Sequence, residues 1–195
     1  MVTRFRWTVA LMFCVAPASA AQGPAIASAA DQIAAAVLPL PVDARATAAV
    51  LGYGADGKLT TLRKGTGSMI CLADDPKATQ FHVACYHESM EPFMARGREL
   101  RASGISGTQV DTVRFREAKS GRLKVPNHPA SLYSLTGGAF DPATKTAPGA
   151  RWLYVVYVPY ATAASTGLSE KPQEGAPWLM FPGTPKAHIM FVPRM

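Results

Sequence analysis

The sequence predicts an α+β fold, in which an antiparallel sheet carries one or two packed helices and a long Pro/Gly-rich C-terminal loop follows. Three observations carry this prediction. Asp56-Gly57 between two apolar segments is a hairpin signal, because such turns need a positive φ. Residues 89–102 carry helix signals at both ends, and residues 152–158 are continuously apolar, as in a central strand.

The first half of the chain is expected to form a short helix and a four-stranded meander. Residues 31–38 are rich in alanine, and prolines at 39 and 41 end the helix there. The four expected strands lie at residues 46–53, 58–63, 68–72 and 81–86.

The expected helix at residues 89–102 packs on this sheet. Ser89 suits its N-cap, and Gly104 suits the position just after its end. Residues 106–119 allow two interpretations. Ser106 with Gln109 resembles a capping box, whereas residues 113–116 alternate as a strand does, and we favour the helix.

The C-terminal third is expected to contain three strands and one long loop. The strands lie at residues 132–135, 152–158 and 188–192. Residues 159–186 are rich in Pro, Gly, Ser and Thr and predict an ordered loop around Trp178. Long loops in compact domains are often functional.

Residues 1–20 resemble a cleaved signal peptide. Arg4 and Arg6 precede an apolar run, and Ala18-Ser19-Ala20 fits the small-x-small pattern before a cleavage site. Residues 21–195 then form one globular domain, which is periplasmic or secreted. The apolar run is shorter than the roughly 20 residues that span a bilayer, and no transmembrane segment is expected.

The positive charge lies in one segment. The net charge is +7, and loss of the two signal-peptide arginines leaves +5. Residues 96–124 hold eight basic and three acidic residues, so that the rest of the mature chain is neutral. Solvated helix faces explain such a segment most simply, but Arg114, Arg116 and Arg122 are candidates for binding an anionic partner.

The two cysteines of the mature chain, Cys71 and Cys85, are predicted to form a disulfide between neighbouring strands. The alternative is a metal site formed with His82, His87 and acidic neighbours. Their spacing matches no known zinc pattern, and along a strand His82 points away from His87. No metal and no other cofactor is therefore expected.

Other functional motifs are weak. Residues 52–57 spell G-x-G-x-x-G, but a strand follows them instead of a helix, which argues against a nucleotide cofactor. No nucleophile motif occurs, and the best acid–base candidates are His87, Glu88 and Glu91.

Aromatic residues offer a different kind of site. Trp152, Tyr154 and Tyr160 are expected on one face of their strand, where they could bind a sugar, but core packing is the simpler explanation. Trp178, in the long loop, is the better candidate for touching a ligand.

Several runs resemble uncharacterised exported bacterial proteins. They are residues 65–76, 81–87, 91–98, 176–178 and 182–188. The resemblance implies export from a bacterium, and no assigned activity carries over from it. The charge confined to one segment and the missing catalytic signature favour a non-enzymatic binding or cell-envelope accessory protein whose partner is an anionic or glycan component. The alternative is a small secreted hydrolase or metal-dependent enzyme that uses the region of His82, His87, Glu88 and Glu91.

Overall fold

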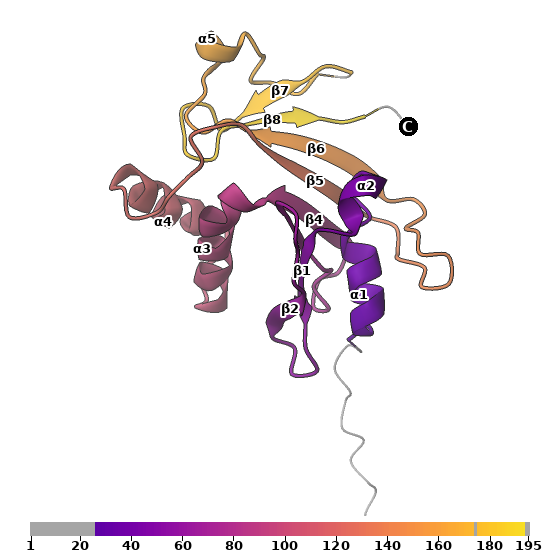
Figure 1. Cartoon of the computed structure of the whole chain (residues 1–195). Coiled ribbons are helices and arrows are strands. Elements are labelled where there is room, and N and C mark those ends of the chain that lie inside the picture. The colour runs from indigo at the N-terminus through magenta and orange to yellow at the C-terminus, as the bar shows by residue number, and fades with distance from the viewer. Residues whose placement is uncertain (1–25, 174, 194–195) are drawn as a thin grey trace, which may run out of the picture.

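The computed structural model describes residues 26–173 and 175–193, so the predicted signal peptide lies outside the described residues. The fold is α+β, with one eight-stranded mixed sheet in the order β2-β1-β3-β4-β5-β6-β8-β7 (Figure 1). The strands are β1 (Ala49–Tyr53), β2 (Leu59–Arg63), β3 (Met69–Leu72), β4 (His82–His87), β5 (Ala130–Thr136), β6 (Arg151–Tyr157), β7 (Trp178–Met180) and β8 (His188–Phe191). The helices are α1 (Ala29–Ala36), α2 (Val42–Arg45), the 3-10 turn η1 (Glu88–Met90), α3 (Glu91–Ala102), α4 (Thr108–Lys119) and α5 (Ala163–Thr166).

The predicted strands of the first half are present, but the meander is wrong. The β1–β2 hairpin forms as expected, whereas β3 pairs with β1 in parallel, on the side away from β2. The backbone N–H groups of Thr66 and Gly67 both donate to the Thr47 carbonyl, which fastens the connection across the end of β1. The other six strand pairings in the described chain are antiparallel.

Alternate residues along a strand point to opposite faces of the sheet, and each face packs into a different hydrophobic cluster. Cys85 packs with Val50 under α1, whereas the next residue, Tyr86, packs with Phe93 of α3 on the opposite face. This alternation follows from the two-residue period of a strand. Helix α1 therefore covers β1 to β4 on one face, and α3 with α4 covers the other face (Figure 1).

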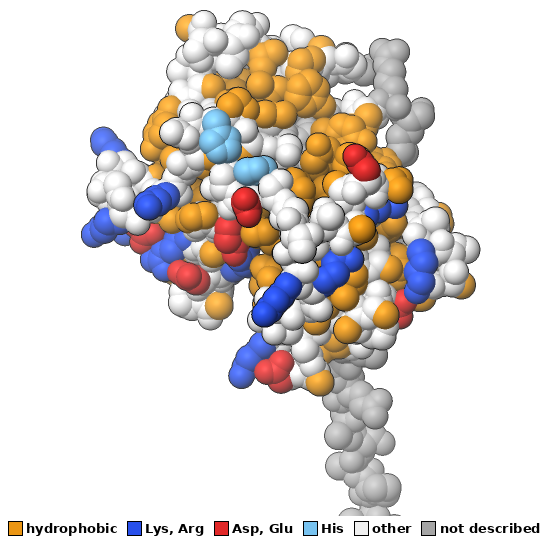
Figure 2. Space-filling view, viewed as in Figure 1, with side chains coloured by type: hydrophobic (Ala, Val, Ile, Leu, Met, Phe, Trp, Pro, Cys, Tyr) orange, Lys and Arg blue, Asp and Glu red, His pale blue; other side chains and the backbone are white. Residues whose placement is uncertain are grey.

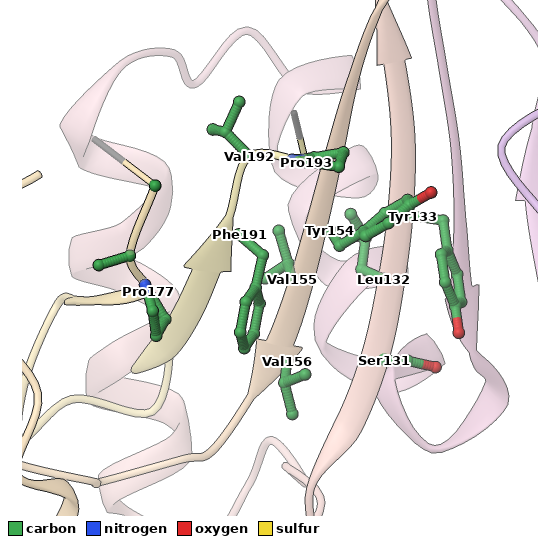
Figure 3. A pocket seen from close by; sticks show the side chains of 12 residues that line it. Ser131, Leu132, Tyr133, Tyr154, Val155, Val156, Pro177, Phe191, Val192 and Pro193 are labelled. Atoms are coloured by element: carbon green, nitrogen blue, oxygen red, sulfur yellow. The ribbon is translucent and has the colours of Figure 1, made fainter. Parts of the chain in front are cut away.

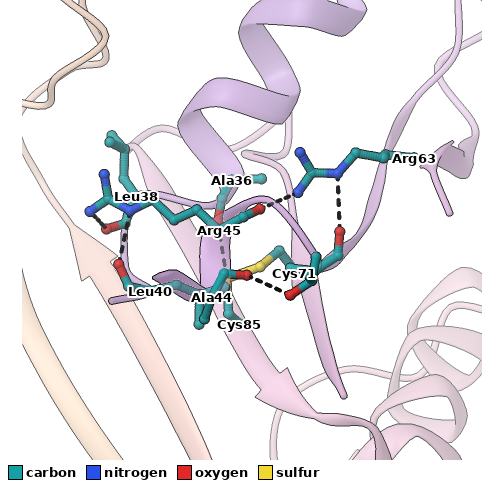
Figure 4. Close-up of a disulfide and its surroundings, with 10 residues drawn as sticks. Ala36, Leu38, Leu40, Ala44, Arg45, Arg63, Cys71 and Cys85 are labelled. Carbon is teal, nitrogen blue, oxygen red and sulfur yellow. Dashed lines mark hydrogen bonds between the residues drawn. A yellow bond between two sulfur atoms is a disulfide. The ribbon is translucent and has the colours of Figure 1, made fainter. Parts of the chain in front are cut away.

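Cys71 and Cys85 lie opposite each other on β3 and β4 at disulfide distance, with Cα atoms 4.0 Å apart. The predicted pairing is thus present, buried beneath the end of α1 (Figure 4). Two arginines fasten the chain above it. Arg45 donates to the Leu38 and Leu40 carbonyls, and Arg63 donates to carbonyls of the segment that leads into β1.

Residues 106–119 contain a helix, α4, and not the alternative strand. The helix is present, but its N-cap is Gly107 and no side chain caps it, so the expected capping box does not form. Residues 113–116 alternate between apolar and basic side chains as a strand does, because a basic residue occupies a buried position of the helix. Arg114 lies on the buried side, four residues after the buried Val110.

The expected C-terminal loop is only partly a loop. Residues 159–186 contain α5 and the edge strand β7, which pairs with β8. Strand β6 lies inside the sheet between β5 and β8, as its apolar sequence predicts. None of the described helices combines the length and apolar character that crossing a membrane requires.

Candidate functional site

The half of the sheet that α1 leaves uncovered carries a hollow of about 530 Å³. It lies over β5, β6 and β8 (Figure 3). Tyr133 is opposite Cys85 in the sheet, so the hollow lies on the face that α1 covers further along. Tyr133 comes from β5, Tyr154 and Val156 from β6, and Phe191 from β8, and Pro177 closes one side. A concave and mainly apolar surface with a few polar groups is the usual form of a ligand site.

Aromatic rings in and beside this hollow contact one another, and Tyr154, at their centre, is exposed. The ring of Tyr154 lies 5.6 Å from that of Tyr133 and 6.1 Å from that of Trp152, and both contacts are edge-on. Tyr154 is 36% exposed and Phe191 is 38% exposed. The expectation that Trp152 and Tyr154 are core residues is therefore wrong for Tyr154. Tyr160 does not share this face, because it lies after the strand and lines a separate pocket beside His128.

A second hollow of about 330 Å³ extends the first one toward α2. The two share Tyr133 and Tyr154, and Trp152, Pro41 and Val42 line the extension. We call the two hollows together the aromatic groove. Among the residues that the structure describes, its lining contains one charged residue, Arg45, whose guanidinium is already bonded to two backbone carbonyls.

Three hydroxyl groups of the aromatic groove are available to a ligand. They belong to Ser131, Tyr133 and Tyr154, and within the described residues none of them takes part in a hydrogen bond. A hydroxyl can both donate and accept, so a ligand could satisfy each group in either sense. The groove therefore combines aromatic surface, free hydroxyls and almost no charge.

The three predicted basic binding residues do not lie together on the surface. Arg114 is 5% exposed, and its guanidinium stacks 3.9 Å above the centre of the Phe93 ring while it pairs with Asp111. Arg116 and Arg122 are exposed. Arg114 thus joins α4 to α3, whereas the other two face solvent.

Trp178 is largely enclosed, although it lines a separate hollow of about 440 Å³ beside Pro172 and Pro193. It is 8% exposed, lies at the start of β7 and pairs with Met190 of β8. Its indole Nε1 is buried and has no hydrogen-bond partner in the described chain. Its side chain and its strand pairing hold β7 on the sheet, which is a structural role.

The structure does not assemble the proposed acid–base cluster. His82 and His87 stand at opposite ends of β4, and Glu88 is exposed. The Glu91 carboxylate accepts from the Tyr86 hydroxyl at 2.5 Å and pairs with Arg98 at 2.6 Å. Burial, followed by this carboxylate, raises the pKa of Tyr86 far above its usual value, so that the phenol stays protonated.

His87 acts as a cap at the start of η1. Its Nδ1 accepts the backbone N–H of Ser89, and because a backbone N–H can only donate, the proton of the neutral ring sits on Nε2. The ring of His128 meets it edge-on at 5.7 Å. Coordination of a metal through Nε2 would require the other tautomer, which would set Nδ1–H against the Ser89 N–H. Across the described residues, no three His, Cys, Asp or Glu side chains gather as metal ligands would.

The aromatic groove is the site that sequence reasoning missed. The signal was present in the alternation of Trp152 and Tyr154, but the sequence did not show which part of the sheet has no helix above it. Comparisons of the chain with protein-family models, curated proteins and solved structures found no match.

Proposed function

We propose that this chain is an exported, non-enzymatic binding domain that holds a neutral glycan in the aromatic groove. Three features support export: the signal-like residues 1–20, the disulfide-forming pair Cys71 and Cys85, and the resemblance to exported proteins. Disulfides persist in oxidising compartments and are rare in the cytosol.

The single observation that carries the glycan assignment is the exposed platform of Tyr133 and Tyr154 with its free hydroxyls. A sugar ring has an apolar face of C–H groups and a rim of hydroxyls. The face packs on aromatic rings and the rim exchanges hydrogen bonds with phenol and serine hydroxyls. Because the groove has almost no free charge, a neutral sugar fits it better than an ionic ligand does.

The test is retention of the protein by insoluble neutral polysaccharides, with cellulose and chitin as probes. Tyr154→Ala removes the ring at the centre of the groove, and we expect at least a tenfold loss of affinity. Tyr160→Ala is the matched control, because Tyr160 is 49% exposed yet lies outside the groove. Its affinity should stay within twofold of the wild type.

Equal affinities for the two variants would contradict the proposal. A second outcome would contradict it in another way. Should the wild type be a dimer and the Tyr154→Ala protein a monomer by light scattering, the groove would be a contact between copies of this chain. Tyr154→Phe completes the series, since it keeps the ring and removes only the hydroxyl.

A further inference from the structure

Five exposed basic side chains lie on α3, on α4 and just after α4, the two helices that pack on the opposite face of the sheet from the aromatic groove. They are Arg101 at the end of α3, Arg116 and Lys119 on α4, and Arg122 and Lys124 just after α4. All five are exposed, and none takes part in a salt bridge within the described residues. We call them the outer cations. Figure 2 shows Lys and Arg side chains gathered over α3 and α4, with acidic side chains between them.

The acidic residues of the same segment are occupied by other arginines. Arg96 binds Glu117 through two hydrogen bonds of 2.8 Å and also reaches Glu99 at 3.1 Å. Arg114 pairs with Asp111, which Lys186 also contacts at 2.8 Å. These arrangements connect α3 to α4 and connect α4 to the segment before β8.

This pairing leaves the outer cations without a salt-bridge partner of their own within the described residues. The hydrogen bonds from Arg96 lower the pKa of Glu117, and those from Lys186 and Arg114 lower the pKa of Asp111 despite its burial. The acids are therefore ionised and already satisfied at neutral pH. The net charge of +5 for residues 96–124 resides on the outer surface, where it attracts anions.

We propose that the outer cations bind an acidic polysaccharide, meaning a polymer that bears carboxylate, sulfate or phosphate groups. The rest of this surface is polar, with Thr108, Gln109 and Thr112 exposed on α4. None of the large exposed apolar residues of the described chain comes from α3, α4 or the segment just after α4, so these elements offer no apolar side chain to insert into a lipid bilayer or to stack on nucleic-acid bases. This site does not depend on the aromatic groove, because α4 packs on the other face of the sheet.

The experiment uses heparin as the acidic polysaccharide and measures affinity of the mature chain against salt. The variant R116Q/K119Q/R122Q/K124Q removes four outer cations. The matched control, K64Q/K77Q/R151Q/K171Q, removes four exposed basic residues at other places and changes the net charge equally. We expect the outer-cation variant to lose at least tenfold in affinity and its salt slope to fall by roughly three to four, because each of the four lost ionic contacts contributes about 0.7–0.9. The control should stay within twofold.

Two results would overturn the proposal. An equal loss for both variants would mean that net charge alone governs binding. If anionic vesicles or duplex DNA displaced bound heparin at a lower concentration of negative charge than free heparin requires, the surface would belong to another class of partner. Matching melting temperatures confirm that both variants are folded.

Discussion

Reduction of the Cys71–Cys85 bond should destabilise the protein by about 3 kcal/mol. The two cysteines are 14 residues apart, so the bond closes a loop of about 15 residues in the unfolded chain. The chain-entropy relation gives roughly 3 kcal/mol for a loop of that length at 25 °C. In a domain of this size that change lowers the melting temperature by roughly 6–12 °C.

The assay is urea denaturation of the wild type with and without reductant, followed by intrinsic fluorescence. Both cysteines are completely buried, so reduction should occur only through unfolding and should be slow in native buffer. The reduced native state also keeps its packing, because the Cys85 sulfur lies 3.1 Å from the Ala36 carbonyl and a thiol could donate to it. The variant C71A/C85A should match the reduced wild type to within about 1 kcal/mol, the scale on which two lost buried sulfurs act. Oxidised and reduced proteins of equal stability would refute the entropic reasoning or the bond itself.

Two further predictions concern buried ionisable groups. Arg114→Leu should lower the free energy of unfolding by about 2 kcal/mol, below the 3–5 kcal/mol of a fully isolated buried charge because Lys186 still pairs with the carboxylate left behind. Arg116→Leu, on the exposed side of the same helix, should change it by less than about 0.5 kcal/mol in the same urea titration, and equal losses would contradict the structural role of Arg114. Burial lowers the pKa of His188 below 6.5, so the folded state keeps the ring neutral while the unfolded chain takes up a proton as the pH falls. Stability should therefore be complete above about pH 7 and should fall as the pH drops through 6.5. His188→Phe should flatten this slope. An unchanged slope in His188→Phe would show that His188 is not the group responsible.

The local elements were predictable because their signals are local. The Asp56-Gly57 turn specified the β1–β2 hairpin, and Gly104, with a φ of 87°, stands just after α3 as the sequence indicates. The parallel pairing of β1 with β3 has no such signal. A meander would place β3 on the free edge of β2, whereas the structure places it on the free edge of β1, and both arrangements allow the same alternation of side chains. The backbone N–H groups of Thr66 and Gly67 bond to the Thr47 carbonyl and hold the observed connection.

The aromatic groove could not be predicted because it results from a mismatch in size. Eight strands about 4.8 Å apart make a sheet roughly 35 Å wide. Helix α1 has eight residues and is about 12 Å long, and a helix covers a strip only about 10 Å wide. It can cover one half of its face, and the side chains of β5, β6 and β8 on that face stay open. A sequence pattern reports which residues share a face, but it does not report whether anything packs on it.

The basic segment also shows that the sequence gives the total charge but not where each charge lies in the structure. Eight basic and three acidic residues predict a net charge of +5, and the structure leaves five outer cations exposed. The three others, Arg96, Arg98 and Arg114, each pair with a carboxylate and hold α3 against its neighbours. The sequence made Arg114 a binding candidate because its charge is visible in the sequence but its burial is not. Its place on the buried side of α4 makes it a structural residue, and the same packing directs Arg116 and Lys119 toward solvent, where a polyanion can reach them.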